Sequence, residues 1–483
     1  MEKRRDTDRG GGLLIHLPII RHGRAYRSLD TQTIFDPASS QVLAEISLAN
    51  TGLIRIDARE KKKLATSFRN HPSSEILGII REAGEIFLNA DLEIGPEGPK
   101  TSFESYLDQV SASTGLPKEI CRGHGHRLRG ALVHIRETVN ALTNGLSDEA
   151  LDTYLRDSPS QLADNLGIVL PSNAPGVNGL WFPLIAFRTP IAIKPGHADP
   201  WTPLRLIAAF VKAGIPAEFF SFYPSDHAGG RALLLSRDTG IIFGSDQTTA
   251  LYKNNPKIQR NGAGYSKVLF DSRSSLEAHD YLPFLKECVV YNGGRSCTNT
   301  STIVLSSGAE KLARSLAEEL LEIEALPLNS KGAILGGYSD AAIPNAISEA
   351  LDRALEIPGA KDISLQERGS SRVQEAQGLH FLLPTVIHCS DREHPLAQSE
   401  YPFPMVSIVE CPEGELETWL GNTLALTLIS DQEELLRELQ KSPKVSTLRH
   451  GPVPTTTNRW ESPHIGNLFE LLRLDEKNSG DMT

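Results

Sequence analysis

The middle third of the chain alternates strand-like and helical segments, and this alternation constrains the fold more than any other feature. Residues 191–194 form a short apolar run, residues 203–214 have helical spacing and stop at a glycine, and residues 218–223 are again strand-like. A helix at about 227–236 and a strand at 240–243 complete the series. Such alternation predicts a parallel sheet with helices on its faces, and these sheets bind nucleotides at the carboxyl ends of their strands.

A second α/β region follows, with different element lengths. Its clearest helix is marked by apolar residues at helical spacing, namely Leu312, Leu316, Leu320 and Ile323. Glycines cluster at 261–266, where we expect the seam between two domains. The predicted organisation is a dinucleotide-binding domain at 1–262, whose first dozen residues form a disordered arm, and a second domain at 263–450. Residues 451–483 would be a tail that returns to the first domain or lies at an oligomer interface.

The charge and cysteine content exclude several classes of protein. The chain carries 60 acidic and 49 basic side chains, so general binding to nucleic acid is not expected. Its five cysteines show no CxxC spacing, which argues against a zinc knuckle or a disulfide framework. His16 and Pro18 interrupt the apolar run at 13–20, which is too short for a signal peptide or a membrane span. We expect a cytoplasmic protein.

The glycine-rich segment at 262–265 invites comparison with a dinucleotide-binding fingerprint. That fingerprint must follow a strand and open a helix, whereas here a strand follows. We therefore interpret Gly262-Ala-Gly264 as a hinge or a tight turn.

Three polar residues lie in segments that suggest chemistry. Cys297 ends a glycine-rich turn at 291–297, where backbone N–H groups could stabilise a thiolate or an oxyanion. A small buried apolar role for Cys297 is an equal alternative on this pattern alone, and the other four cysteines are interpreted as structural. Lys194, at the carboxyl end of a strand, is positioned to contact a ribose or a phosphate. Asn173 lies between two prolines, where a simple loop role is the alternative.

In their order along the chain, these segments resemble the aldehyde dehydrogenase family. Six segments carry the resemblance: 35–45 for the family's NPATGEVIAE hairpin, 171–175 for PWNFP, 194–197 for KPxE, 243–245 for FTGS, 292–297 for NxGQxC and 400–406 for EIFGPV. The resemblance extends from about residue 15 to about residue 450. Each segment alone is a weak match, and the shared order and spacing make the set specific.

The resemblance implies an aldehyde dehydrogenase-like α/β fold, with a Rossmann-like dinucleotide-binding domain and a second α/β catalytic domain that has a parallel-rich sheet. It implies that Cys297 attacks a carbonyl to form a thiohemiacetal and then a thioacyl-enzyme. The Asn173 amide and the Cys297 backbone N–H would form the oxyanion hole. The implied cofactor-binding residues are Lys194, His197, Gly244, Ser245 and Glu400, and no metal is expected.

One departure from the family concerns release of the acyl group. Hydrolytic members carry a glutamate in an ELGGK segment that activates water, but residues 259–267 contain no carboxylate. CoA-acylating members also lack it. We therefore predict an NAD(P)-dependent oxidoreductase that interconverts an aldehyde and an acyl-thioester, with CoA as the type of acceptor. The alternatives are a carboxylate-forming enzyme with a different base, and a catalytically silent nucleotide-binding relative.

The histidines raise separate questions. His197 stands where the family has a ribose-binding glutamate, which makes NADP acceptable beside NAD and slightly favoured. A solvent-facing His197 is the alternative. His124 and His126 are two residues apart and cannot share a helix face, so we interpret both as surface residues and not as metal ligands. The resemblance also leads us to expect a homodimer or a homotetramer.

Overall fold

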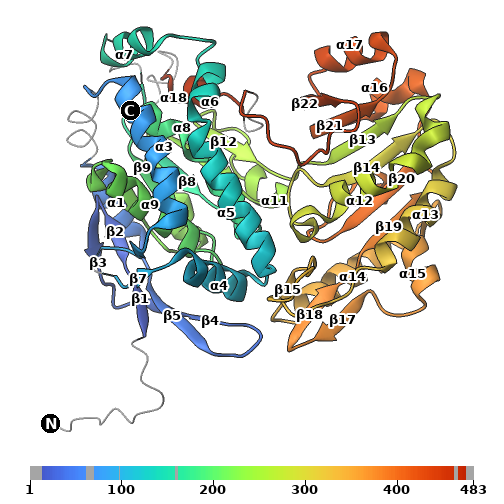
Figure 1. Ribbon diagram of the computed structural model, residues 1–483, viewed down its shortest axis with the longest axis horizontal. Coiled ribbons are helices and arrows are strands. Elements are labelled where there is room, and N and C mark those ends of the chain that lie inside the picture. The colour runs from blue at the N-terminus through green and yellow to red at the C-terminus, as the bar shows by residue number, and fades with distance from the viewer. Residues whose placement is uncertain (1–13, 61–69, 97, 158–161, 462–465, 475–483) are drawn as a thin grey trace.

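The computed structural model describes residues 14–60, 70–96, 98–157, 162–461 and 466–474. It contains two α/β domains that lie side by side (Figure 1). The arm predicted for the first dozen residues lies outside the described residues. Among the described residues, no helix is both long enough and apolar enough to cross a membrane.

The first domain is built on a seven-stranded sheet with the order β12-β11-β8-β9-β10-β2-β3. Its strands are β2 (Ile19–Arg21), β3 (Arg24–Tyr26), β8 (Leu166–Val169), β9 (Ile191–Lys194), β10 (Phe220–Phe222), β11 (Thr239–Phe243) and β12 (Ile258–Asn261). The five strands from β8 to β12 pair in parallel, as the alternation in the sequence predicts. From β8 the chain adds β9 and β10 on one side, and then β11 and β12 on the other. The strand order therefore reverses between β8 and β11, where such sheets have a crevice at their carboxyl ends.

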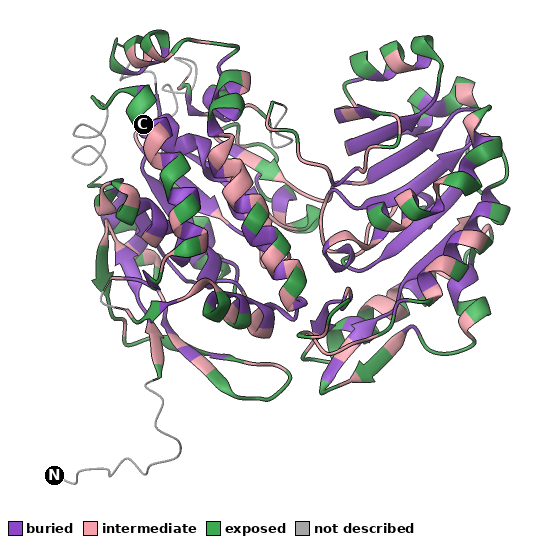
Figure 2. Ribbon diagram, in the orientation of Figure 1, coloured by how far each residue is buried: buried purple, intermediate pink, exposed green. Residues whose placement is uncertain are grey.

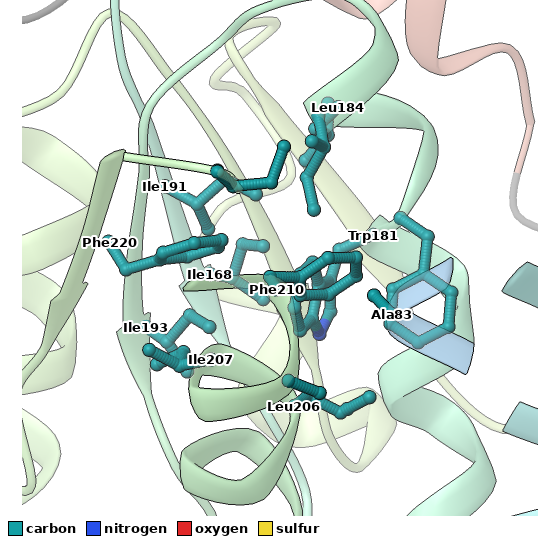
Figure 3. Packing of buried hydrophobic residues seen from close by; sticks show 14 of the residues in the cluster. Ala83, Ile168, Trp181, Leu184, Ile191, Ile193, Leu206, Ile207, Phe210 and Phe220 are labelled. Atoms are coloured by element: carbon teal, nitrogen blue, oxygen red, sulfur yellow. The ribbon is translucent and has the colours of Figure 1, made fainter. Parts of the chain in front are cut away.

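Helices on the faces of this sheet enclose its core. They include α3 (Ser73–Asn89), α5 (Lys118–Val133), α9 (Trp201–Ala213) and α10 (His227–Leu235). Figure 3 shows the aromatic rings of Trp181, Phe210 and Phe220 beside the strand residues Ile168 and Ile193. The Trp181 and Phe210 ring centroids are 5.7 Å apart, and those of Phe210 and Phe220 are 5.8 Å apart. This packing fixes the strand ends from which the site is built.

The second domain has its own seven-stranded sheet, with the order β16-β19-β20-β14-β13-β21-β22. Its strands are β13 (Ser266–Phe270), β14 (Thr300–Leu305), β16 (Ala360–Asp362), β19 (Thr385–Cys389), β20 (Met405–Glu410), β21 (Thr423–Ile429) and β22 (Val445–His450). Only β16 runs antiparallel to its neighbour. The central strands are buried along their length (Figure 2). Helix α13 (Ala309–Leu321) buries Leu312, Leu316 and Leu320, as their spacing predicts.

Smaller elements complete the described part of the chain. Three short sheets are formed by β1 (Ile15–Leu17), β4 (Thr31–Phe35) and β5 (Val42–Ser47), by β15 (Gly337–Tyr338), β17 (Val373–Ala376) and β18 (Leu379–Leu382), and by β6 (Leu92–Glu93) and β7 (Lys100–Thr101). The further helices are α1 (Thr51–Ala58), α4 (Phe103–Thr114), α6 (Ile135–Leu142), α7 (Asp148–Asp157), α8 (Pro183–Ala186), α11 (Asp246–Ala250), α12 (Leu282–Val290), α14 (Ala342–Leu355), α15 (Ile363–Arg368), α16 (Leu416–Trp419), α17 (Glu433–Lys441) and α18 (Leu468–Leu472). The 3₁₀ segments are η2 (Pro175–Trp181), η3 (Ala217–Phe219), η4 (Ser274–Tyr281), η5 (Tyr291–Gly294), η6 (Pro395–Gln398) and η7 (Glu413–Glu415).

The chain passes between the two domains at the predicted glycine-rich seam. Strand β12 ends at Asn261 in the first sheet, and β13 begins at Ser266 in the second. A Cβ at Gly264 would overlap the Cys297 carbonyl, so the close approach of the two segments requires glycine there. A strand and not a helix follows this segment, as expected when it is not a dinucleotide-binding fingerprint.

The chain passes back to the first domain after β22. Helix α18 packs against α6 and α8 of that domain. Its Phe469 ring lies 5.0 Å from the Phe187 ring and 5.2 Å from the Tyr154 ring, measured between centroids. The last described helix is therefore part of the first domain's core.

Candidate active site

The predicted site residues follow or precede strands at the edges where the two sheets approach each other. In the first domain, Asn173 follows β8 and Ser245 follows β11, both at carboxyl ends. In the second domain, Cys297 precedes β14 and Glu400 precedes β20, both at amino ends. The site is thus built from the carboxyl ends of one sheet and the amino ends of the other.

A cavity of about 400 Å³ lies between these edges. The first domain contributes side chains from α5, η2 and the end of β11, and the second contributes the segment around Cys297. The seam and the start of β21 complete the lining with Asn261, Gly264 and Thr423. Cys297 is partly exposed to this space, whereas the other four cysteines are buried, as expected for structural thiols.

A strained turn presents Cys297 to the cavity. Three consecutive residues, Asn292, Gly293 and Gly294, have φ values of 52°, 61° and 73°. Asparagine tolerates this left-handed region better than most residues, and glycine enters it freely. A Cβ at Gly294 would overlap the backbone of Phe403 and Pro404, so glycine is required there by close approach as well. The glycine-rich sequence thus has a direct structural reason.

The Cys297 thiol is protonated in this arrangement. Loss of solvent raises its pKa to about 12, and the nearby negative charge of Glu400 acts in the same direction. A backbone N–H group lowers the pKa, as the sequence suggested it could, but burial and the Glu400 charge have the larger effect. The thiol therefore needs a base before it can act as a nucleophile.

A hydrogen-bonded chain connects the two domains beside Cys297. The Asn173 amide nitrogen donates to the Arg295 carbonyl at 2.7 Å, and the Asn292 amide nitrogen donates to the Asn173 carbonyl at 3.2 Å. His124 Nε2 donates to the Asn292 side-chain oxygen at 2.7 Å. The contact with Arg295 uses one of the two Asn173 amide hydrogens.

The prediction that His124 lies on the surface is wrong. Its side chain is 3% exposed and lines the cavity, and loss of solvent lowers its pKa to about 4. The imidazole is neutral, with the proton on Nε2 because the Asn292 oxygen accepts there. Gly176 lies against Nδ1, where a Cβ would be 2.6 Å away. His126, two residues further along α5, is exposed as predicted.

Glu400 is held at the seam by backbone amides. One carboxylate oxygen accepts from the N–H groups of Gly264 at 3.0 Å and Tyr265 at 2.6 Å. Loss of solvent raises the pKa of Glu400 to about 7 despite these hydrogen bonds. Lys267 is fully buried nearby and donates to the Tyr265 carbonyl at 2.8 Å. Its pKa is lowered to about 8 by burial, and the charge of Glu400 opposes that shift.

The residues predicted to bind the nucleotide lie around the crevice of the first domain. The Ser245 hydroxyl caps α11 by accepting from the Thr248 N–H at 3.3 Å, and Gly244 precedes it. Lys194 is buried and donates to the Pro195 carbonyl at 3.1 Å. His197 is exposed, and partial loss of solvent, followed by the positive charge of Lys194, lowers its pKa. Lys194 and His197 thus lie at and just beyond the carboxyl end of β9, Gly244 and Ser245 follow β11, and Glu400 lies at the seam.

Sequence reasoning missed the part of the site that α5 contributes. His124, Arg127 and Ala131 lie at spacings of three and four on this helix and all line the cavity. The spacing was visible in the sequence, but their partners are far away along the chain. Within the described ranges, no three histidine, cysteine, aspartate or glutamate residues come together to hold a metal ion.

Comparison with known proteins identifies the family. The aldehyde dehydrogenase family model matches residues 165–418, which include every predicted site residue. The chain belongs to the aldehyde dehydrogenase family. It is 24% identical over 326 residues to N-succinylglutamate 5-semialdehyde dehydrogenase from Vibrio cholerae. The aligned region covers 64% of this chain and 64% of that protein. The match therefore spans slightly less than two thirds of the curated relative's length.

Solved structures of this family share the fold. The NAD-dependent benzaldehyde dehydrogenase from Corynebacterium glutamicum is 15% identical, with a TM-score of 0.73 over 93% of this chain and 95% of that one. Aldehyde dehydrogenase 21 from Physcomitrella patens, in complex with the product succinate, is also 15% identical, with a TM-score of 0.72 over 92% of each chain. The predicted fold class is confirmed.

Proposed function

We propose that this protein is an NAD(P)-dependent oxidoreductase that oxidises an aldehyde through a covalent thioacyl intermediate on Cys297. The observation that carries the proposal is the junction of the two domains at the cavity. There, Asn173 from one sheet edge is hydrogen-bonded to the segment that presents Cys297 from the other. A thiol at a cavity, with a carboxylate and an amide side chain near its segment, is the equipment that acyl chemistry requires.

The chain's own residues account for the first step. A base removes the proton from the Cys297 sulfur, which forms a bond to the aldehyde carbon while the carbonyl π electrons move to oxygen. Glu400 is the carboxylate whose charge acts on Cys297, and with a pKa of about 7 it can accept a proton near neutral pH. The Asn173 amide and the Cys297 backbone N–H would stabilise the resulting oxyanion.

The first domain fits a dinucleotide. A crevice at the point where strand order reverses is where such sheets bind nucleotides. The lysine at the end of β9, the hydroxyl of Ser245 and the small Gly244 offer contacts for ribose and pyrophosphate there. When bound, a nicotinamide supplies the hydride acceptor for the oxidation. His197 brings no negative charge against a 2′-phosphate, which supports acceptance of NADP as well as NAD.

Release of the acyl group has two candidate routes, each with its own support. The curated relative's name favours a carboxylic acid product, and Glu400 is a carboxylate whose charge acts on Cys297. In contrast, the described residues that line the cavity, Asn261 among them, include no aspartate or glutamate. The absence of a carboxylate there favours transfer of the acyl group to a thiol such as CoA. We retain both routes, since a thiol acceptor needs less help from a base than water does.

Intact-protein mass spectrometry tests the common core of this proposal. The full-length protein is incubated with a panel of aldehydes plus NAD⁺ or NADP⁺, and with acyl-CoA thioesters without cofactor. We expect an acyl adduct on Cys297 that is absent from the Cys297→Ala variant. A matched Cys121→Ala variant, which alters a buried thiol outside the cavity, should keep the adduct. Formation of the adduct on another residue would contradict the proposal.

A further inference from the structure

The charge of the cavity lining differs sharply from that of the whole chain. The protein has a formal charge of −11, with 60 acidic and 49 basic side chains. The described residues that line the cavity nevertheless include Arg127, Arg260 and Arg459 and no aspartate or glutamate. A space walled in this way raises the local concentration of anions and disfavours cations.

Of these arginines, Arg127 has the best defined position. It lies on the same face of α5 as His124, and its guanidinium carbon is 4.5 Å from the centre of the Tyr291 ring. Its Nη1 donates to the Thr456 carbonyl at 3.2 Å and to the Asn458 side-chain oxygen at 3.3 Å. These contacts hold the guanidinium in place without neutralising it, and the described residues contain no ion pair to Arg127.

A guanidinium presents five N–H donors in a planar fork that matches a carboxylate. The hydrogen bonds of Arg127 to Thr456 and Asn458 use one of its three nitrogens, Nη1. The same cavity lining includes Cys297 and apolar side chains, among them Val177 and Leu180. The lining therefore has a reactive thiol, an apolar stretch and a fixed cation.

We propose that Arg127 is a specificity-determining residue that selects aldehydes bearing a carboxylate at the end remote from the carbonyl. This inference rests on the proposed function, because it assumes that an aldehyde reacts at Cys297. The carboxylate pairs with Arg127 while the carbonyl carbon lies at the sulfur. The apolar stretch accommodates the methylene chain between them.

The test compares ω-oxo acids of four to six carbons with their methyl esters, which have the same aldehyde and a similar shape but no charge. We expect the wild-type protein to use the best acid with a kcat/KM about 10- to 100-fold above that of its ester, the range for a charged hydrogen bond. Arg127→Gln and Arg127→Met should reduce this acid-to-ester ratio towards one. Arg127→Lys should retain part of it, because the charge remains without the fork.

The matched control is Arg129→Met. Arg129 lies on the same helix, is not part of the cavity lining and forms an ion pair with Glu85. Its replacement should leave the acid-to-ester ratio unchanged. Equal use of acid and ester by the wild-type protein, or an Arg127→Gln variant with an undiminished ratio, would overturn the inference.

A binding measurement separates this inference from the proposed function. Alkylation of Cys297 by iodoacetamide is followed by intact mass, with glutarate or its dimethyl ester present. We expect the diacid to protect the wild-type thiol and to lose at least tenfold in protection in Arg127→Gln. If neither acids nor esters are turned over but this protection appears, the proposed function fails and the anion site stands. If esters are turned over and the diacid gives no protection, the anion site fails and the function stands.

Discussion

The two ends of the site differ in how completely they are organised before any ligand binds. At the sulfur end, side chains from both domains are connected by hydrogen bonds of 2.7 to 3.2 Å through Asn173, Asn292 and His124. At the nucleotide end, Lys194 donates to the carbonyl of its own neighbour and His197 is exposed. Hydrogen bonds across the two domains hold the sulfur end, whereas at the proposed nucleotide end a ligand would have to displace the Lys194 contact. On the proposed function, this difference puts the most precise positioning at the reacting carbon and not at the adenosine.

Removal of the nucleophile should separate the two ends most clearly. We expect Cys297→Ala to lower turnover by about 10⁴-fold or more, since a nucleophile carries most of the covalent mechanism. Dinucleotide binding should remain, because none of its predicted contacts involves the sulfur. Fluorescence quenching on titration with NADPH measures the second quantity. A variant with normal turnover would show that another residue is the nucleophile.

The second largest expected effect is on the rate at which the acyl group leaves Cys297. If Glu400 does not activate water, hydrolysis loses the factor of about 10²–10⁴ that general base catalysis supplies. With aldehyde and NAD(P)⁺ the protein then gives one burst of reduced cofactor and stalls, and added CoA restores turnover. Stopped-flow absorbance at the reduced-nicotinamide band resolves the burst.

The opposite outcome has its own signature. If Glu400 is the base, acid forms without a thiol, and its rate rises as the pH increases through about 7, where this carboxyl loses its proton. Glu400→Gln should then abolish the rise. Rapid hydrolysis that is independent of both thiol and Glu400 would contradict each of the two routes.

Loss of the Asn173 amide should lower turnover without removing the nucleophile at the sulfur end. Asn173→Ala removes a side-chain donor from the oxyanion site, and we expect kcat to fall by about 10²–10³-fold. Nucleotide affinity should be unchanged. Asn178, a buried amide in η2 that hydrogen-bonds to Pro175 and Trp181, provides a control for general damage. If Asn178→Ala lowers kcat by as much as Asn173→Ala does, the assignment of Asn173 to an oxyanion hole is wrong.

The smallest expected effect is on dinucleotide affinity, from substitution of His197. We expect NADPH to bind at least as tightly as NADH, and His197→Glu to weaken NADPH by about tenfold, or about 1.4 kcal/mol, through charge repulsion. Titration of both dinucleotides against both proteins measures this. A wild-type protein that binds NADH ten times more tightly than NADPH would contradict the interpretation of His197.

Local pattern accounts for what could be predicted from the sequence. The alternation of strands and helices at 191–243 determines the first sheet, because a strand buried on both faces and an amphipathic helix have different periods. The turn before Cys297 was predictable as well, since Asn292, Gly293 and Gly294 are consecutive residues that tolerate positive φ. Both features depend on neighbours within a few residues, whereas the close approach of Gly294 to Phe403 and Pro404 does not.

The features that were missed depend on contacts that local pattern does not contain. Helix α5 around His124 is polar in sequence, and the histidine is buried by Asn292 and Gly176 from distant segments. Arg127 similarly meets Thr456 and Asn458, which come from the far end of the chain. A single sequence contains the residues of such a contact but not their proximity.

The return of α18 to the first domain has a consequence for the order in which the protein is made. Leu468, Phe469 and Leu472 belong to the same buried cluster as Leu17 near the start of the described chain. The second sheet, from Ser266 to His450, lies wholly between them in sequence. On the ribosome, the residues of the second domain are complete before the first domain can close its core. The core of the domain that begins the chain therefore receives its last residues only after the second domain has been synthesised.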